Sequence, residues 1–230
     1  MAAVLCIGGM LVADAAGAQT PAQEPPGPWV LDLRGITSPV PDEAALYPVL
    51  DSTALVPSRG FGLGLGAHVY LLNVGASRLG VGLEVVNVRA VTRPPEPEAP
   101  ATGQAPPTPA GQQLQIDLRT VAPQISFNFG SRAGWSYLSG GLGTADVLTR
   151  TAGTAPGRRD SGRLNALNVG GGARWFLKSH LAFGFDVRMH RIAAGPARAA
   201  EQTAPGATPA LAVATPGMMI LSVGVGLSVR

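Results

Sequence analysis

Apolar residues alternate with glycine or polar residues along most of the chain beyond residue 28. Between residues 61 and 71, leucine, valine and other apolar residues occupy odd positions, with glycine, histidine and tyrosine at even positions. The same period of two recurs at residues 181–189 and 219–229. Successive side chains of a β-strand point to opposite faces, so each segment has one apolar face and one polar or glycine face. The pattern therefore predicts an all-β chain.

The connections between the predicted strands alternate in length. The strands are expected at 29–37, 60–71, 79–91, 113–129, 133–149, 163–176, 179–192 and 217–230. Long connections at 38–59, 92–112, 150–162 and 193–216 alternate with short ones at 72–78, 130–132 and 177–178. Tight periplasmic turns and long outer loops are typical of up-and-down barrels in an outer membrane. We therefore predict an eight-stranded antiparallel up-and-down transmembrane β-barrel over residues 29–230.

Proline positions support these strands, because proline cannot donate a hydrogen bond to a neighbouring strand. Pro123 is the only one of the 21 prolines inside a predicted strand. Near it the apolar residues change parity, from even positions up to Leu118 to odd positions from Val121. We expect a β-bulge near Thr120–Pro123 that absorbs one extra residue. Alternatively, residues 113–118 project above the membrane, where the direction of a side chain no longer matters.

Glycine and a small set of charged residues occupy the face opposite the apolar one. Away from the strand ends this set holds four acidic and four basic residues. A soluble barrel such as a lipocalin places apolar side chains inside, and a membrane barrel does the reverse. Eight strands enclose an interior that side chains just fill, so we favour the membrane barrel with charges paired inside. The predicted interior polar network consists of Asp32, Arg34, His68, Glu84, Asp117, Arg119, Arg174, Asp186, Arg188 and His190.

Aromatic residues gather at the strand ends that meet at the short connections. Outer-membrane barrels carry aromatic girdles at the membrane interfaces. The distribution predicts a girdle at the periplasmic interface, whereas Phe61 is the main candidate for an outer girdle. The periplasmic set is Trp29, Tyr70, Phe127, Phe129, Trp135, Tyr137, Trp175, Phe176, Phe183 and Phe185.

The N-terminal residues resemble a targeting signal. Residues 2–12 are small and apolar, and Ala16-Gly17-Ala18 fits the cleavage rule of a secretory signal peptide. We expect a signal peptide over 1–18 and a proline-rich lead segment over 19–28. A short buried helix is the alternative, although the lead segment would give it nothing to pack against. The only cysteine, Cys6, lies in the predicted signal peptide, so the mature protein would have neither a disulfide nor a thiol nucleophile.

Composition excludes several other classes of protein. The formal net charge of +3 is too small for this length to indicate nucleic-acid binding. The 31 glycines follow no three-residue period, which excludes collagen. A hydrophobic fraction of 46% is too high for a disordered chain. No apolar run beyond the N-terminus is long enough for a transmembrane helix.

The segment GGGARWFLKSHLAFGFDVRMH, at 170–190, resembles a hairpin of the small outer-membrane β-barrel family, which includes the OmpA transmembrane domain, OmpX-like and opacity-type proteins. The last strand is similar to that family's assembly signal, with Ser222, Gly224, Leu227 and Val229 at the matching positions. The resemblance implies insertion by the barrel-assembly machinery. The family usually ends on an aromatic residue, whereas this chain ends on Val229-Arg230. We expect no peptidoglycan-binding domain after the barrel, so the resemblance does not carry over a tethering role.

The family contains barrel enzymes, and the histidines are the residues to weigh for catalysis. A lipid A deacylase of the eight-stranded type requires a His-x-Ser pair, but tyrosine, alanine and isoleucine lie two positions after His68, His180 and His190. Asp186 and His190 share a strand face, yet the pattern delivers no serine to them. We expect an interior hydrogen-bond network instead. No catalytic residue is predicted.

No metal or cofactor site is expected either, because the chain lacks a His-x-His motif and clustered carboxylates. Residues 62–67 match a Gly-x-Gly-x-x-Gly/Ala pattern, but they lie in an alternating strand and not at a strand-to-helix turn.

Together these observations predict a structural outer-membrane barrel with a polar, plugged interior, no catalysis and no cofactor. A narrow porin-like channel for small solutes and a lipid A-modifying envelope enzyme are the alternatives. The expected partners are outer-membrane lipid and lipopolysaccharide, with the barrel-assembly machinery during insertion and no nucleic acid. The expected state is a monomer that reaches the cell outer membrane through the periplasm. The proline-rich loops at 93–112 and 193–216 are expected to be solvated spacers.

Overall fold

The computed structural model describes residues 27–47, 55–92, 112–131, 133–153, 156–202 and 211–230. The predicted signal peptide at 1–18 and residues 19–26 of the predicted lead segment lie outside these described residues. The same holds for residues 93–111 of the predicted loop 93–112 and for residues 203–210 of the predicted loop 193–216.

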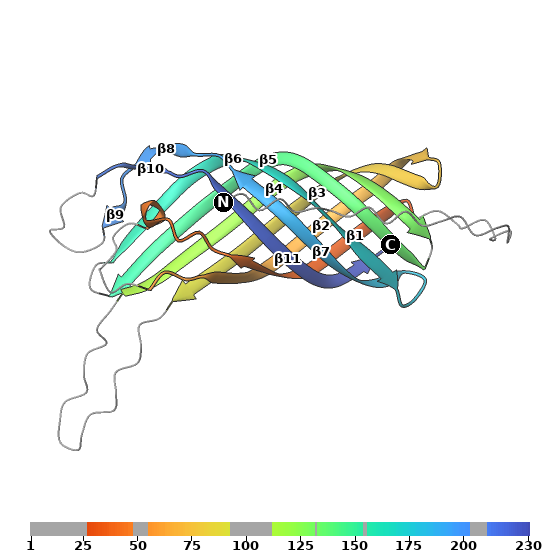
Figure 1. The fold of residues 1–230 in the computed structure, drawn as a ribbon, viewed down its shortest axis with the longest axis horizontal. Helices are drawn as coiled ribbons and strands as arrows, with labels where there is room; N and C mark the ends of the chain where they lie inside the picture. Colours follow the sequence, from red (N-terminus) through yellow and green to blue (C-terminus); the bar gives the residue numbers. More distant parts are fainter. Residues whose placement is uncertain (1–26, 48–54, 93–111, 132, 154–155, 203–210) are drawn as a thin grey trace, which may run out of the picture.

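Eight long antiparallel strands close into a barrel (Figure 1). Neighbours follow the chain order, β5 pairs with β6, and the last strand pairs with the first to close the ring. This architecture confirms the predicted eight-stranded antiparallel barrel. The strands are β1 (Trp29–Pro39), β2 (Arg59–Val74), β3 (Ser77–Thr92), β4 (Gln112–Ser131), β5 (Gly134–Gly153), β6 (Gly157–Phe176), β7 (Leu181–Ile192) and β11 (Met218–Val229).

The two ends of the barrel differ. At the turn end, short connections at 75–76, 132–133 and 177–180 join β2 to β3, β4 to β5 and β6 to β7. β1 begins and β11 ends at this same end, where Leu31 pairs with Val229. The opposite end, which we call the loop end, carries the short elements η1 (Ala44–Leu46), β8 (Gly195–Arg198), β9 (Glu201–Gln202) and β10 (Val213–Thr215).

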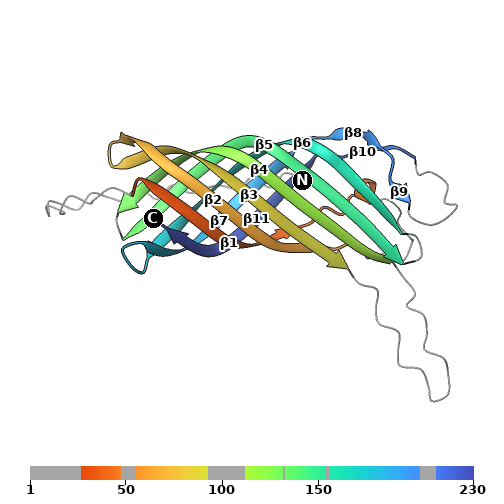
Figure 2. The ribbon, with the colours of Figure 1, turned by 180° about the vertical axis from the view of Figure 1, so that it is seen from behind.

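The short strands extend the barrel wall at the loop end. β8 pairs with β10, and β9 pairs with β6. Figure 2 shows these elements together at the right, with the short turns gathered at the left. Among the described residues, no helix has the length and apolar character needed to cross a membrane.

The long connection predicted at 150–162 is wrong. β5 continues to Gly153 and β6 begins at Gly157, and Arg150 pairs with Arg158 across the two strands. The alternation of apolar residues missed this part of the sheet because its outward positions are polar. It lies beyond the apolar band, where apolar spacing no longer marks a strand.

A register shift occurs in the β5–β6 pair. The pairing slips by one residue between Asp146 and Leu148. On the facing part of β6, Gly162 has φ +65°. A glycine in this left-handed region is typical of a β-bulge, since other residues adopt it only with strain. The bulge reverses the parity of β6, so odd positions face inward before Gly162 and even positions after it.

β4, in contrast, crosses the barrel without a bulge. Its pairing with β3 has no register shift, and even-numbered side chains from Leu114 to Asn128 are buried along its whole length. The bulge predicted near Thr120–Pro123 is therefore wrong. The environment changes there, because apolar side chains face inward toward the loop end and outward toward the turn end. The alternative interpretation, in which 113–118 lies above the membrane, fits this arrangement.

Apolar side chains cover the outside of the barrel between the turn end and the level of Thr120. Leu71, Leu142 and Met219 are 67%, 74% and 69% exposed. A large continuous exposed apolar surface is unfavourable in water and is typical of a barrel that lies in lipid. The exterior is therefore that of a membrane barrel, and a lipocalin-like arrangement does not describe it.

Candidate functional site

Six charged side chains lie in the interior, between the two ends of the barrel. Each is at most 5% exposed. They occupy even positions of strands whose odd-numbered neighbours face lipid, so their placement follows from the period of two. The carboxylates and guanidinium groups balance, and these six groups carry no net charge together. They are Asp32 and Arg34 on β1, Glu84 on β3, Arg174 on β6, and Asp186 and Arg188 on β7.

Asp32 and Arg174 form a bidentate pair across the barrel. Nε and Nη2 of Arg174 donate to Oδ1 and Oδ2 of Asp32 at 2.8 and 2.7 Å. Ser228 on β11 donates its hydroxyl to Oδ1 at 2.5 Å. The Arg174 guanidinium also lies 3.9 Å from the ring centroid of Tyr137. Two parallel charge-assisted hydrogen bonds fix both the distance and the orientation of the pair.

Glu84 is the centre of a second group. Its Oε1 accepts a hydrogen bond from Arg34 and lies 3.2 Å from Nε of Arg188. Its Oε2 accepts from the side-chain amides of Gln124 at 2.9 Å and Asn168 at 2.5 Å. Donors from four other strands thus surround a single carboxylate, which satisfies its acceptor capacity.

Asp186 on β7 connects the group around Glu84 to Tyr137 on β5. Its Oδ1 lies 2.9 Å from Nη1 of Arg34, and its Oδ2 lies 3.0 Å from Nη2 of Arg188. The Tyr137 hydroxyl donates to Oδ2 at 2.7 Å. Arg34 and Arg188 therefore each contact both Glu84 and Asp186. Removing one partner from such a buried set leaves an uncompensated charge, which costs about 3–5 kcal/mol.

Glycines on the facing strand provide the space for these side chains. A Cβ atom at Gly66 would lie 3.2 Å from Oδ2 of Asp32 and 3.4 Å from Nη2 of Arg34. At Gly82 it would lie 2.2 Å from Cδ2 of His68. The inward glycines therefore make room for the polar network.

Two of the ten residues predicted for the interior lie outside it. Arg119 is exposed on the outer face of β4. Asp117 accepts hydrogen bonds from Arg89 at 2.5 Å and from Arg150 at 2.7 Å, also on the outer face. The prediction was wrong for Asp117 and Arg119 because it assumed a bulge in β4. Without the bulge, odd positions of β4 face outward throughout.

The two interior histidines attach to different parts of the network. Nε2 of His68 lies 3.3 Å from Oε1 of Gln124, which links it to the Glu84 group. Nε2 of His190 lies 3.3 Å from Oγ of Ser222, whose hydroxyl also lies within hydrogen-bond distance of the Arg188 carbonyl. Sequence reasoning missed Ser222 as a partner of His190, because the contact depends on the register between β7 and β11.

An apolar layer closes the interior at the turn end. Val30, Tyr70 and Trp135 are buried together, and Phe176 packs against them. We call these four residues the turn-end plug. The Trp135 ring meets Tyr70 edge-on at 6.3 Å and lies 4.9 Å from the ring of Phe176.

This layer corrects the predicted aromatic girdle. Tyr70, Trp135 and Tyr137 are at most 5% exposed and face the interior. Trp29 and Trp175 are 41% and 49% exposed on the lipid side, together with Phe129, Phe183 and Phe185. The prediction used the position of each aromatic residue along its strand and ignored its parity. Parity decides which residues form the girdle and which form the plug.

A second apolar layer closes the loop end. After β1 the chain turns into the barrel mouth, where Val40 packs against the core and Leu46 and Tyr47 are 3% and 4% exposed. We call residues 40–47 the loop-end plug. Burial raises the pKa of Tyr47 to about 12, with a smaller contribution from Asp42, so this phenol stays neutral in its apolar layer. The layer below it includes Ala90, Leu114, Ile116, Leu118, Ala145, Val147, Leu164, Ala166, Ile192, Met218 and Ile220.

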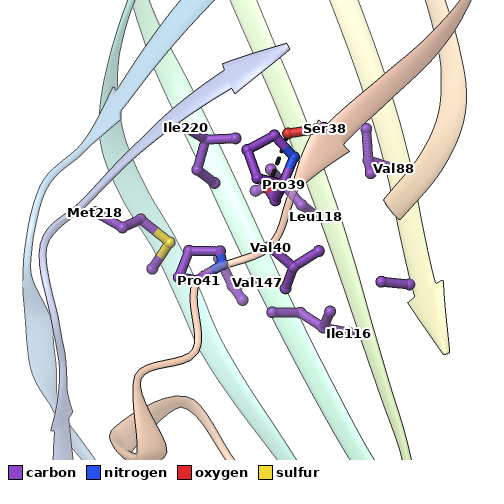
Figure 3. A pocket seen from close by; sticks show the side chains of 11 residues that line it. Ser38, Pro39, Val40, Pro41, Val88, Ile116, Leu118, Val147, Met218 and Ile220 are labelled. Atoms are coloured by element: carbon purple, nitrogen blue, oxygen red, sulfur yellow. Dashed lines mark hydrogen bonds between the residues drawn. The ribbon is translucent and has the colours of Figure 1, made fainter. Parts of the chain in front are cut away.

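Hydrogen bonds hold the loop-end plug in the mouth. Thr149 donates its hydroxyl to the Leu46 carbonyl at 2.6 Å. The buried Arg159 guanidinium donates to the carbonyls of Ala45 and Val213, and so joins η1 to β10. Figure 3 shows the remaining space beneath the plug, between Pro39, Val40 and the walls; its volume of about 20 Å³ holds roughly one water molecule.

Within the described ranges, no group of three or more His, Cys, Asp and Glu side chains is arranged to hold a metal ion. Along the barrel, the interior consists of the layer of paired charges between two apolar layers, one at the turn end and one at the loop end. Of the predicted assembly signal on β11, Ser222 and Gly224 face inward and Leu227 and Val229 face outward. Its recognition by an assembly machinery stays a prediction.

Solved structures share this fold. The chain is similar to Neisserial surface protein A, with a TM-score of 0.52 and 11% identity over 88% of this chain and 96% of that chain. It also matches Ail, the attachment invasion locus protein of Yersinia pestis in complex with the heparin analogue sucrose octasulfate, with a TM-score of 0.48 and 12% identity over 87% and 96% of the two chains. For the outer membrane protein OprG of Pseudomonas aeruginosa the TM-score is 0.44, with 13% identity over 91% and 99%.

No family model and no curated protein matches the sequence. The similarity to Neisserial surface protein A confirms the fold as that of a small outer-membrane β-barrel, which the hairpin resemblance implied.

Proposed function

We propose that this chain is a structural outer-membrane barrel with a sealed interior and no catalytic activity. The observation that carries the proposal is the filling of the interior at three successive levels, by the turn-end plug, the paired charges and the loop-end plug. A signal peptide would direct the chain to the periplasm, and the barrel-assembly machinery would insert it. The inserted barrel would be a monomer surrounded by lipopolysaccharide and other outer-membrane lipid.

The paired charges favour a sealed barrel over a channel. Arg34 and Arg188 each contact two carboxylates, so an ion entering this layer would have to separate groups that are already compensated. The apolar layers on either side would strip the hydration shell of an ion without replacing it, which is unfavourable.

The His190–Ser222 contact is the feature nearest to a catalytic arrangement. A serine nucleophile needs a base that a third group orients, and it needs access to substrate. Among the described residues His190 Nδ1 has no hydrogen-bond partner, and His190 and Ser222 are 2% and 4% exposed. This geometry supports a structural role for both side chains.

Planar-bilayer recording tests the sealed interior. We expect no steady single-channel openings from the full chain after reconstitution. A variant that weakens all three levels, Trp135→Ala with Leu46→Ser, Glu84→Ala and Arg188→Ala, is the control, since it shows that reconstituted protein is detectable when the interior opens. Steady openings of the unaltered protein would overturn the proposal in favour of a narrow channel.

Lipid A analysis tests the absence of catalysis. Mass spectrometry of lipid A from cells with and without the protein should show the same acylation. The Ser222→Ala variant is the control that assigns any change to this residue. A difference between cells that disappears with Ser222→Ala would establish an enzyme.

A further inference from the structure

The apolar outer face of the barrel ends in arginines toward the loop end. On β4 the outward side chains pass from Ile125 and Val121 to Arg119. On β6 they pass from Val169 through residues 167 and 165 to Arg163. The same strands carry no such change at the turn end, where their outward positions hold aromatic side chains. On β4 and β6 the basic residues therefore mark the loop-end boundary of the apolar face.

Further toward the loop end, two other arginines face each other directly. Arg150 on β5 and Arg158 on β6 are register partners, and their side chains are 44% and 49% exposed. Like charges directly opposite each other destabilise a strand pair. Gln113 and Gln115 of β4 and these two arginines line one surface hollow of about 370 Å³. The Gln115 amide donates to Asp117 at 2.7 Å. The two cations beside the Gln113 amide form a surface suited to an anion.

Nearby carboxylates do not neutralise this surface. Asp117 is shared between Arg150 and Arg89, and Asp160 lies 3.5 Å from Arg158 with both side chains exposed. Asp146 is flanked in the register by Arg119 on β4 and Arg163 on β6. Glu201 on β9 is the register partner of Arg158 and lines a hollow with Arg198 on β8. The outer face at the loop end still holds a surplus of arginine, in the sets Arg89, Arg119, Arg150, Arg158, Arg163 and Arg198 against Asp117, Asp146, Asp160 and Glu201.

We propose that this arginine surface on β4–β6 binds the phosphate groups of a lipopolysaccharide molecule in the outer leaflet, with Arg150 and Arg158 as its central residues. The proposal rests on the proposed function for the placement of the barrel in the outer membrane. The planar guanidinium fork matches phosphate oxygens in pairs, which an ammonium group does not. Bound phosphate would also relieve the repulsion between the two register partners.

Continuity with the lipid-facing surface identifies a lipid as the occupant. Acyl chains that lie along Ile125, Val121 and Val169 bring their headgroup to the level of Arg119 and Arg163 on the same strands. The Arg150–Arg158 pair lies two outward positions further toward the loop end, because Arg119 and Arg163 are register partners of Asp146 and Arg150 follows it by four residues. A soluble polyanion would gain nothing from contact with the apolar surface that continues the site on the same strands.

Lipid binding by the full chain in neutral detergent tests the proposal, with native mass spectrometry as the readout. The probes are bisphosphorylated lipid A and the same lipid A with both phosphates removed. At physiological salt we expect the phosphorylated form to bind more tightly. The double variant Arg150→Gln/Arg158→Gln should bind it roughly tenfold to thirtyfold more weakly, because each cation near a headgroup contributes about fivefold. Affinity for the dephosphorylated form should not change.

Lys178→Gln is the matched control, since it removes an exposed positive charge at the turn end and should leave binding unchanged. Heat-modifiable gel migration checks that every variant folds. An unaltered chain without this migration would overturn the proposed function itself. Equal binding of both lipid A forms, or an unaffected double variant, would overturn the site alone. Tighter binding of a soluble sulfated polysaccharide than of phosphorylated lipid A would reassign the surface to a polyanion and overturn the lipid proposal.

Discussion

Inside the barrel, single residues with several hydrogen-bonding groups determine the arrangement. Arg34 donates to Glu84 through one terminal nitrogen and pairs with Asp186 through the other. A lysine carries its three donors on one nitrogen, so it would have to reach both carboxylates from a single point. The network therefore depends on guanidinium geometry as well as on charge. The network also depends on Gly66, because a larger residue at this position would crowd the side chains of Asp32 and Arg34.

Replacement of Arg174 by methionine tests the bidentate pair. The change leaves the Asp32 carboxylate buried with the Ser228 hydroxyl as its remaining donor. We expect the free energy of unfolding to fall by about 3–5 kcal/mol, measured by urea titration of the barrel in detergent micelles.

The double variant Arg174→Met/Asp32→Leu is the control for this prediction, since it removes both charges. It should regain most of the lost stability, because paired apolar replacements of a buried ion pair are often neutral. Equal destabilisation of the single and double variants would contradict an electrostatic origin and indicate a packing effect.

Gly66→Val tests the role of the inward glycines. Its side chain would crowd the Asp32 carboxylate and the Arg34 guanidinium, so we expect destabilisation of about 1–3 kcal/mol, as for other overpacked interiors. The outward Gly35, where a Cβ would come no closer than 3.8 Å to another atom, is the matched position. Gly35→Val should be tolerated in the same urea titration, and equal sensitivity at both positions would contradict the prediction.

A single strand can pass from the lipid-facing part of the barrel into the part that lies beyond the apolar band. β4 has the pattern of a membrane strand toward the turn end and that of a soluble strand toward the loop end, although its register with β3 is unbroken. In the sequence alone this change of environment resembles a change of facing, so Asp117 and Arg119 were predicted to lie inside. The true bulge, at Gly162 in β6, lay where no strand was expected. Apolar spacing identifies strands reliably only where one side of the sheet meets lipid.

Arg159→Gln tests how the loop-end plug is held. Arg159 donates to carbonyls of η1 and β10, so its loss should loosen residues 44–47 while the barrel stays intact. We expect at least roughly tenfold faster amide hydrogen exchange in this segment, since local opening is governed by such contacts, with little change in the urea midpoint. Arg158→Gln, on the outer face of the same strand, should leave the exchange unaltered. Equal exchange in Arg159→Gln and the unaltered protein would show that apolar packing alone holds the plug.

At the scale of the whole molecule, the two ends determine orientation. The short turns at one end and the extended strands with β8–β10 at the other predict that the turn end faces the periplasm. The arginine surface is on the opposite side, as a lipopolysaccharide site requires.

Cysteine labelling tests this orientation. Ala199 near β8 and Ser179 in the β6–β7 turn are both exposed, and the native cysteine lies in the predicted signal peptide. A membrane-impermeant maleimide should label Ala199→Cys in intact cells, whereas Ser179→Cys should react only after the outer membrane is permeabilised. The reverse pattern would show the opposite orientation.

The pattern of residues was sufficient to predict the eight barrel strands, the lipid-facing side over most of the barrel, and eight of the residues that lie in its interior. These features are local, because the period of two records which side of each strand meets lipid. The three-dimensional arrangement of the strands was needed to show which arginine meets which carboxylate, that Ser222 reaches His190, and that Tyr70 and Trp135 close the interior. Those contacts join strands that are distant in sequence, and they depend on inter-strand register, which the spacing of apolar residues does not record.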